Sequence, residues 1–156
     1  MSNETILILE NECYIQWTLK TFLENGGYRV ITANRVEKVL HFFSEYKIAG
    51  LITEYRIDHF CTVETIRELK KGFPKPYVMM LTSAEVGDGE YEKIISAGVD
   101  DYFIKPFSIT KILLHLKKGL LQRNLCIETN RMEEELIKAH NNKNILKEYK
   151  KESAID

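Results

Sequence analysis

The chain has 156 residues, 44% of them hydrophobic and 29% charged, a balance typical of one globular domain with a modest appendage. A net charge of −1, no signal-peptide pattern and no apolar segment of bilayer length exclude a strongly basic nucleic-acid binder and a membrane protein. The cysteines, Cys13, Cys61 and Cys126, lack the C-x-x-C spacing of metal or redox sites, so we expect reduced thiols in a cytoplasmic protein.

Short apolar segments alternate with helix-period segments along the chain. A strand is predicted at 5–9 and a helix at about 12–24. A strand at 28–33 precedes a helix for which Asn34 is the expected N-cap. The later strands are predicted at 50–53, 77–81 and 101–104, and the later helices at 63–72, at about 89–97 and from about Ser108. This alternation predicts a parallel sheet with helices on both faces, which accounts for residues 1–121.

Residues 122–156 have a different composition, with few large apolar residues and many charges of both signs. Apolar or small residues recur at every seventh position, at Leu125, Met132, Ala139 and Leu146. A second seam contains Leu121 and Leu136 but is interrupted by Glu128 and Lys143. The pattern predicts a helical extension that supports a modest homodimer through a coiled coil. The alternative is a single frayed helix in solvent.

Polar side chains follow four of the predicted strands. They are Glu10-Asn11-Glu12 after the first strand, Glu54 after the third, Thr82-Ser83 after the fourth and Lys105-Pro106 after the fifth. Because the carboxyl ends of parallel strands meet at one edge of a sheet, we expect these groups to lie together. Carboxylates are ligands that Mg²⁺ prefers, and a hydroxyl and an ammonium group donate to phosphoryl oxygens. The sequence therefore predicts a site for a divalent cation and a phosphoryl group.

The chain resembles a response-regulator receiver domain, the phospho-accepting partner of a histidine kinase, from residue 4 to about 121. The segment "AGVDDYFIKPF" at 97–107 is close to the family's Gly-Ala-x-Asp-Tyr-x-x-Lys-Pro-Phe ending, and "VMMLTSAE" at 78–85 matches its fourth strand. "LITEYRI" at 51–57 matches the third strand except at Glu54. The resemblance implies an α/β, flavodoxin-like, doubly wound (βα)5 sheet with strand order 2-1-3-4-5, followed by a C-terminal helical extension at 122–156.

The resemblance also implies a role for individual residues. Thr82 matches the hydroxyl that contacts the phosphoryl group, and Lys105 matches the lysine that pairs with the acceptor carboxylate. Pro106 matches a proline after a cis peptide bond. Tyr102 matches the aromatic residue that switches rotamer, and Arg56 matches the residue whose backbone carbonyl binds the metal.

The departures from the family pattern fall on the acidic residues. Glu10 and Asn11 stand where the family has two aspartates, and Glu54 stands at the phospho-acceptor position. The implied metal set is Glu10, Asn11, Glu54 and the Arg56 carbonyl, with one charge fewer, so we expect weak Mg²⁺ binding. The additional methylene of Glu54 moves its carboxylate by roughly 1–1.5 Å. A misplacement of about 1 Å can cost roughly 100-fold in rate.

Three interpretations of Glu54 remain open: an inert carboxylate paired with Lys105, a fixed mimic that holds Thr82 and Lys105 in an active-like arrangement, and a genuine acceptor. We favour a degenerate receiver that is not an enzyme and that binds a histidine kinase or another signalling protein. A homodimer through the last two receiver helices, the fifth strand and the C-terminal helix is also expected. The alternative is a conventional phospho-accepting receiver that uses Glu54 and regulates an output domain beyond the linker. The sequence contains no helix-turn-helix pattern that would indicate DNA binding.

Overall fold

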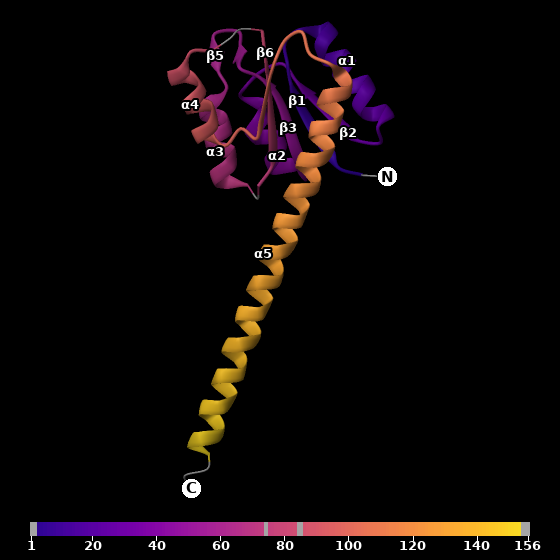
Figure 1. The fold of residues 1–156 in the computed structure, drawn as a ribbon. Helices are drawn as coiled ribbons and strands as arrows, with labels where there is room; N and C mark the ends of the chain where they lie inside the picture. The colour runs from indigo at the N-terminus through magenta and orange to yellow at the C-terminus, as the bar shows by residue number, and fades with distance from the viewer. Residues whose placement is uncertain (1–2, 74, 84–85, 154–156) are drawn as a thin grey trace. The chain divides into compact units, whose positions relative to one another are not determined.

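The computed structural model describes residues 3–73, 75–83 and 86–153. Within them, five strands form one parallel sheet in the order β2-β1-β3-β6-β7 (Figure 1). The strands are β1 (Thr5–Leu9), β2 (Arg29–Ala33), β3 (Ile48–Glu54), β6 (Tyr77–Thr82) and β7 (Asp101–Ile104). This is the predicted 2-1-3-4-5 order, so the predicted flavodoxin-like α/β fold is confirmed.

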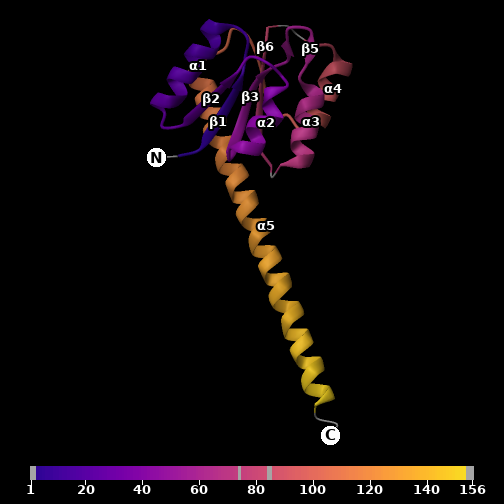
Figure 2. The same ribbon diagram turned by 180° about the vertical axis from the view of Figure 1, so that it is seen from behind.

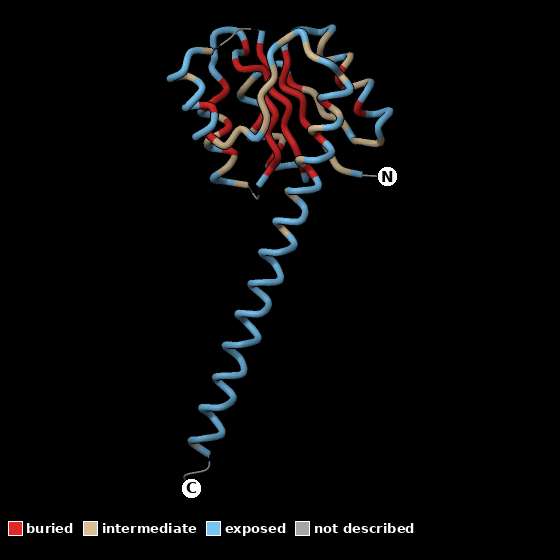
Figure 3. Tube along the Cα trace, viewed as in Figure 1, coloured by how far each residue is buried: buried red, intermediate tan, exposed pale blue. Residues whose placement is uncertain are grey.

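Helices cover both faces of the sheet (Figures 1 and 2). Helices α2 (Lys38–Glu45), α3 (Val63–Gly72) and α4 (Asp88–Ala97) pack on one face, and α1 (Cys13–Asn25) and the first turns of α5 (Ile109–Glu152) pack on the other. Because successive side chains of a strand point to opposite faces, the central strands contribute to two cores. Every residue of β3 and β6 is buried, which explains their continuous apolar runs (Figure 3).

Most predicted boundaries agree with the structure, and the prediction for Asn34 is wrong. Helix α2 begins at Lys38, with Glu37 at its N-cap and no side-chain hydrogen bond there. The residues before it form a bend and a turn, in which the Lys38 N–H bonds to the Arg35 carbonyl at 3.3 Å. Val36 packs against the core from this turn, so its apolar side chain imitates the periodicity of a helix.

A two-stranded hairpin between β3 and α3 was not predicted. It consists of β4 (Arg56–Ile57) and β5 (Phe60–Cys61), with Asp58 at a φ of 54° in its turn. The buried Thr62 hydroxyl closes the loop by donating to the Glu54 and Tyr55 carbonyls, at 2.9 and 3.2 Å. Two-residue strands are too short to show a period, and for that reason the sequence pattern misses them.

The structure divides into two compact units, Met1–Leu121 and Gln122–Asp156. Within the second unit, every described residue up to Ser153 is helical or at the helix end, and nearly all side chains there are exposed (Figure 3). None of the described helices combines the length and apolar character needed to span a bilayer.

Candidate phosphoryl site

Strand register brings the predicted polar residues to one edge of the sheet. Leu9 of β1 pairs with Thr53 of β3, and Glu54 pairs with Leu81 of β6. The backbone continues this alignment past the strands, where the Lys105 N–H donates to the Thr82 carbonyl at 2.7 Å. The carboxyl ends of β1, β3, β6 and β7 therefore meet, as a parallel sheet requires.

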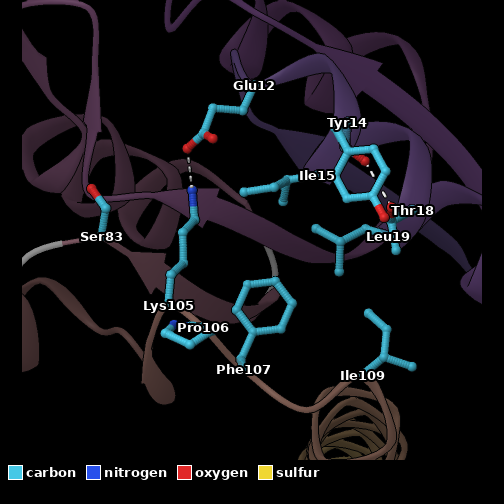
Figure 4. Close-up of a pocket in the computed structure, with 10 residues that line it drawn as sticks. All are labelled: Glu12, Tyr14, Ile15, Thr18, Leu19, Ser83, Lys105, Pro106, Phe107 and Ile109. Carbon is cyan, nitrogen blue, oxygen red and sulfur yellow. Dashed lines mark hydrogen bonds and ion pairs between the residues drawn. The ribbon is translucent and has the colours of Figure 1, made fainter.

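Three carboxylates converge on the Lys105 ammonium group. Its Nζ lies 2.8 Å from Glu54 Oε2, 2.9 Å from Glu10 Oε2 and 3.0 Å from Glu12 Oε1. Figure 4 shows the Lys105–Glu12 contact of this set. We call Lys105 and these three glutamates the lysine cluster. An ammonium group has three N–H donors, so one donor is available for each carboxylate.

The lysine cluster is largely shielded from water. The side chains of Lys105, Glu10 and Glu54 are 10%, 3% and 7% exposed, whereas that of Glu12 is 58% exposed. Burial acts to lower the pKa of Lys105, but the hydrogen bonds that its ammonium group donates to Glu54, Glu10 and Glu12 outweigh burial and hold that pKa well above its ordinary value. Lys105 therefore remains a cation at physiological pH.

The second oxygens of the two buried carboxylates are also engaged. Glu10 Oε1 accepts the Glu12 backbone N–H at 2.9 Å, and Glu54 Oε1 accepts the Tyr55 backbone N–H at 2.7 Å. Each of these carboxylates thus accepts one hydrogen bond from the lysine and one from the backbone. Buried charges require such partners, because unpaired burial is costly.

The lysine cluster also contains the acidic group that could hold a metal ion. Glu10, Glu12 and Glu54 each offer a carboxylate oxygen, and these oxygens lie within 4.8 Å of one another. Carboxylate oxygens are ligands that Mg²⁺ prefers. However, each of the three glutamates already has an oxygen in contact with Lys105. Lys105 is therefore an internal cation at the focus of these carboxylates, and Mg²⁺ would have to compete with it.

The other members of the implied metal set, Asn11 and Arg56, line a polar cavity together with Glu12 and Glu54. The exposed Asn11 amide donates to Asp58 Oδ1 at 3.3 Å. The Arg56 guanidinium contacts Glu90 of α4 at 3.3 Å and lies over the Tyr55 ring, 5.1 Å from its centroid. Glu12, in contrast, was absent from the implied metal set. Its position two residues after Glu10 in an acidic run was the signal that could have identified it.

A polar cavity of about 470 Å³ lies beside Glu54. Asn11, Glu12, Thr82 and Ser83 line it together with Glu54, so both predicted hydroxyl-bearing positions face the space next to the acceptor position. The motif that contains them continues to 84 and 85, which lie outside the described residues. This volume is ample for a phosphoryl group.

Two further predicted residues flank the site. Tyr102 of β7 is half-buried, and its ring meets that of Tyr91 in α4 edge-on, with centroids 6.0 Å apart. The Lys105–Pro106 peptide bond is cis. Tyr102 therefore belongs to the interface between β7 and α4, where a rotamer change would alter the packing of α4.

An apolar cavity of about 580 Å³ adjoins the lysine cluster on the side of α1 (Figure 4). Ile15 and Leu19 of α1 line it opposite Phe107 and Ile109. Tyr14, which is 78% exposed, also lines it. The cavity offers an apolar surface directly beside Lys105.

Comparisons with known proteins agree on the family. The family model of the response regulator receiver domain matches residues 6–117. The alkaline phosphatase synthesis transcriptional regulatory protein PhoP of Bacillus subtilis is 27% identical over 132 residues, which cover 83% of this chain and 54% of PhoP. The transcriptional regulatory protein SrrA of Staphylococcus aureus is 27% identical over 125 residues, 79% of this chain and 49% of SrrA. The chain thus spans about half the length of these curated relatives.

Solved structures share the fold. A CheY-like response regulator receiver domain protein from Methanospirillum hungatei has a TM-score of 0.74 and 22% identity, covering 79% of this chain and 98% of its own. A response regulator from Thermotoga maritima has a TM-score of 0.68 and 24% identity, and the match covers 76% of this chain and 98% of the Thermotoga chain.

Proposed function

Since the chain belongs to the response regulator receiver domain family, we propose that it acts as a protein-interaction module of two-component signalling that works without ordinary acyl phosphorylation. The observation that carries this proposal is the lysine cluster, in which one internal ammonium group satisfies three carboxylates. Receiver domains are signalling modules, and in this one the site acts as a structural clamp.

The first argument concerns the metal. In-line phosphoryl transfer to a carboxylate depends on a cation that neutralises the developing charge. Here Lys105 takes the oxygens that such a cation needs, and Asn11 supplies no charge. We therefore propose that Mg²⁺ binds weakly.

The second argument concerns the nucleophile. Glu54 has one oxygen on Lys105 at 2.8 Å and the other on the Tyr55 N–H at 2.7 Å, and both bonds lower its nucleophilicity. Its added methylene also displaces the carboxylate from the place that an aspartate would occupy. Misplacement by about 1 Å can cost roughly 100-fold, so both effects act against transfer. Of the three interpretations of Glu54, we propose the carboxylate held by Lys105.

The proposal extends to organisation and partners. We assign residues 1–121 to the receiver domain and 122–156 to a helical extension, in a cytoplasmic protein. The partner is a histidine kinase or another signalling protein, and the apolar cavity beside Lys105 supports an interaction role.

The curated relatives are named transcriptional regulators and are about twice as long as the matched region. Regulation of an output region is therefore part of the alternative below.

A conventional phospho-accepting receiver is the second candidate. The observation that favours it is the polar cavity of about 470 Å³, where Thr82 and Ser83 face Glu54. In this alternative, Glu10 and Glu54 would hold Mg²⁺, and Lys105 would give up its bonds to them. A Glu54 oxygen would then bond to the phosphorus of a phosphodonor while the donor's own bond to phosphorus breaks, leaving a glutamyl phosphate and the free donor group, which is acetate when the donor is acetyl phosphate.

Labelling with acetyl phosphate and Mg²⁺ separates the two candidates. We expect no acid-stable, alkali-labile label on the native chain and little on Glu54→Asp alone. The triple variant Glu10→Asp, Asn11→Asp and Glu54→Asp should accept the label, because metal and nucleophile act as one unit. Glu68→Asp, an exposed position on α3, is the matched control and should stay unlabelled. Stoichiometric labelling of the native chain would establish the conventional receiver.

A further inference from the structure

The second unit carries apolar side chains that its own fold leaves in solvent. We call residues 122–153 the tail. Leu125, Met132, Leu136 and Leu146 of the tail are 57%, 51%, 70% and 61% exposed. A single helix cannot bury such a series, and its isolated stability in water is marginal.

These residues lie on one face of the helix. Starting from Leu125, steps of four and three residues give one continuous seam: Leu125, Thr129, Met132, Leu136, Ala139, Lys143 and Leu146. This spacing is that of the a and d positions of a coiled coil. Thr129 is therefore the seam position, and Glu128, which the sequence pattern placed in the second seam, lies beside it. The same steps continue to Lys150, so Lys143 and Lys150 are the charged members of the seam. How these two lysines are accommodated decides how two tails can pair.

Charge is segregated along the tail. Residues 128–135 contain four glutamates and one arginine, whereas residues 138–151 contain five lysines and one glutamate. Within the acidic block, Arg131 forms an ion pair with Glu135, at 3.8 Å, and one arginine cannot pair with four glutamates. Helix-dipole effects reach only the first and last turns, and 128–135 lies about five turns after Ile109. Neither pairing within the helix nor the dipole therefore explains the acidic block.

We propose that the tail pairs with the tail of a second copy in the antiparallel direction. In a parallel pair, the acidic block faces the acidic block, and Lys143 faces Lys143 in the seam. In an antiparallel pair, each acidic block faces residues 140–147 of the other copy, which contain Lys143 and Lys147 and no acid. Opposite charges then face each other, whereas like-charge repulsion disfavours the parallel alternative.

One antiparallel register accommodates the seam. Leu136 lies opposite Ala139 of the second copy, and Thr129 lies opposite Leu146. Lys143 lies opposite Met132, on which its aliphatic stem packs. Its ammonium group then lies within one turn of Glu128 and Glu135 of the second copy. This arrangement rests on the tail alone and is independent of the proposed function.

A spin-label distance measurement on the full chain tests the direction of pairing. The three cysteines are exposed, so Cys13→Ser and Cys61→Ser leave Cys126 as the labelling site. In the proposed register, Cys126 lies opposite residue 149, so two labels are about 35 Å apart at about 1.5 Å per residue. A parallel pair places them within about 20 Å, since paired helix axes lie about 10 Å apart.

Two variants show whether the seam carries the pairing. Leu136→Glu should abolish the 35 Å distance at about 100 μM chain, a concentration that populates a dimer of micromolar Kd. Ile137→Glu is the matched control, because Ile137 is similarly exposed, at 61%, but lies outside the seam, and it should retain the distance. A short distance, no intermolecular distance, or a 35 Å distance that survives Leu136→Glu would each overturn the proposal.

Discussion

Replacing Lys105 with methionine removes the internal cation and retains a side chain of similar length. The change leaves Glu10 and Glu54, which are 3% and 7% exposed, without their partner. Breaking a buried ion pair by removing one side costs about 3–5 kcal/mol. The exposed Glu12 adds little, because solvent screens such a charge. In a domain of this size, the loss corresponds to a fall in Tm of roughly 10–20 °C.

The same variant should acquire a response to Mg²⁺. Three carboxylates within 4.8 Å of one another then lack a cation, and their oxygens suit a divalent ion. If Mg²⁺ binds the variant with a Kd of about 1 mM, about 10 mM Mg²⁺ would raise the free energy of unfolding of Lys105→Met by about 1.4 kcal/mol. This corresponds to a rise in Tm of roughly 5 °C. The native chain should shift by less than about 1 °C at this Mg²⁺ concentration, because Lys105 already holds these oxygens.

Differential scanning calorimetry at pH 7, with and without MgCl₂, measures both effects. Because the folded pKa of Lys105 is raised, its contribution is complete below the ordinary lysine value of about 10.4 and is lost only as pH rises through the folded pKa. The comparison at pH 7 therefore reports the whole contribution. Lys93→Met, at an exposed position of α4, is the control and should change stability by less than about 0.5 kcal/mol. A native chain stabilised by Mg²⁺ as strongly as Lys105→Met would refute the internal-cation argument.

Two other predictions concern the packing of Tyr77. A methyl group at Gly119 would overlap the Tyr77 ring, so Gly119→Ala should destabilise the chain by about 1–3 kcal/mol in urea titrations. Gly89→Ala in α4, which meets nothing within 4 Å, should be neutral or stabilising by about 0.5–1 kcal/mol, and equal effects of the two substitutions would contradict this packing. Burial and then the hydrogen bond to Asp101 raise the pKa of Tyr77 above its ordinary value. Its contribution to stability is therefore complete below about pH 10 and lost as pH rises further, and Tyr77→Phe should remove one late-ionising tyrosine from an ultraviolet titration.

The sequence contains enough information to determine the sheet and its functional edge. Strands β1 and β7 and helix α3 have the predicted bounds because local periodicity and local burial coincide there. The positions of Glu54 and Lys105 at the edge follow from the rule that the ends of parallel strands meet. Strand β3 is longer than predicted: Ile48 and Ala49, both buried, extend it before Gly50, and Ile48 pairs with Thr5 of β1.

The family resemblance implied the contact of Lys105 with Glu54, and tertiary structure alone decided which other polar groups join it. Glu10 and Glu12 after β1 and Glu54 at the end of β3 are brought to the one ammonium group that follows β7, whereas Asn11 contacts Asp58 of the unpredicted hairpin. Contacts between side chains distant in sequence depend on loop geometry and rotamers, which leave no periodic trace in the chain. The sequence by itself thus determined the fold and the place of the site, and the packing of the strand ends determined that Lys105, an internal cation, stands at its centre.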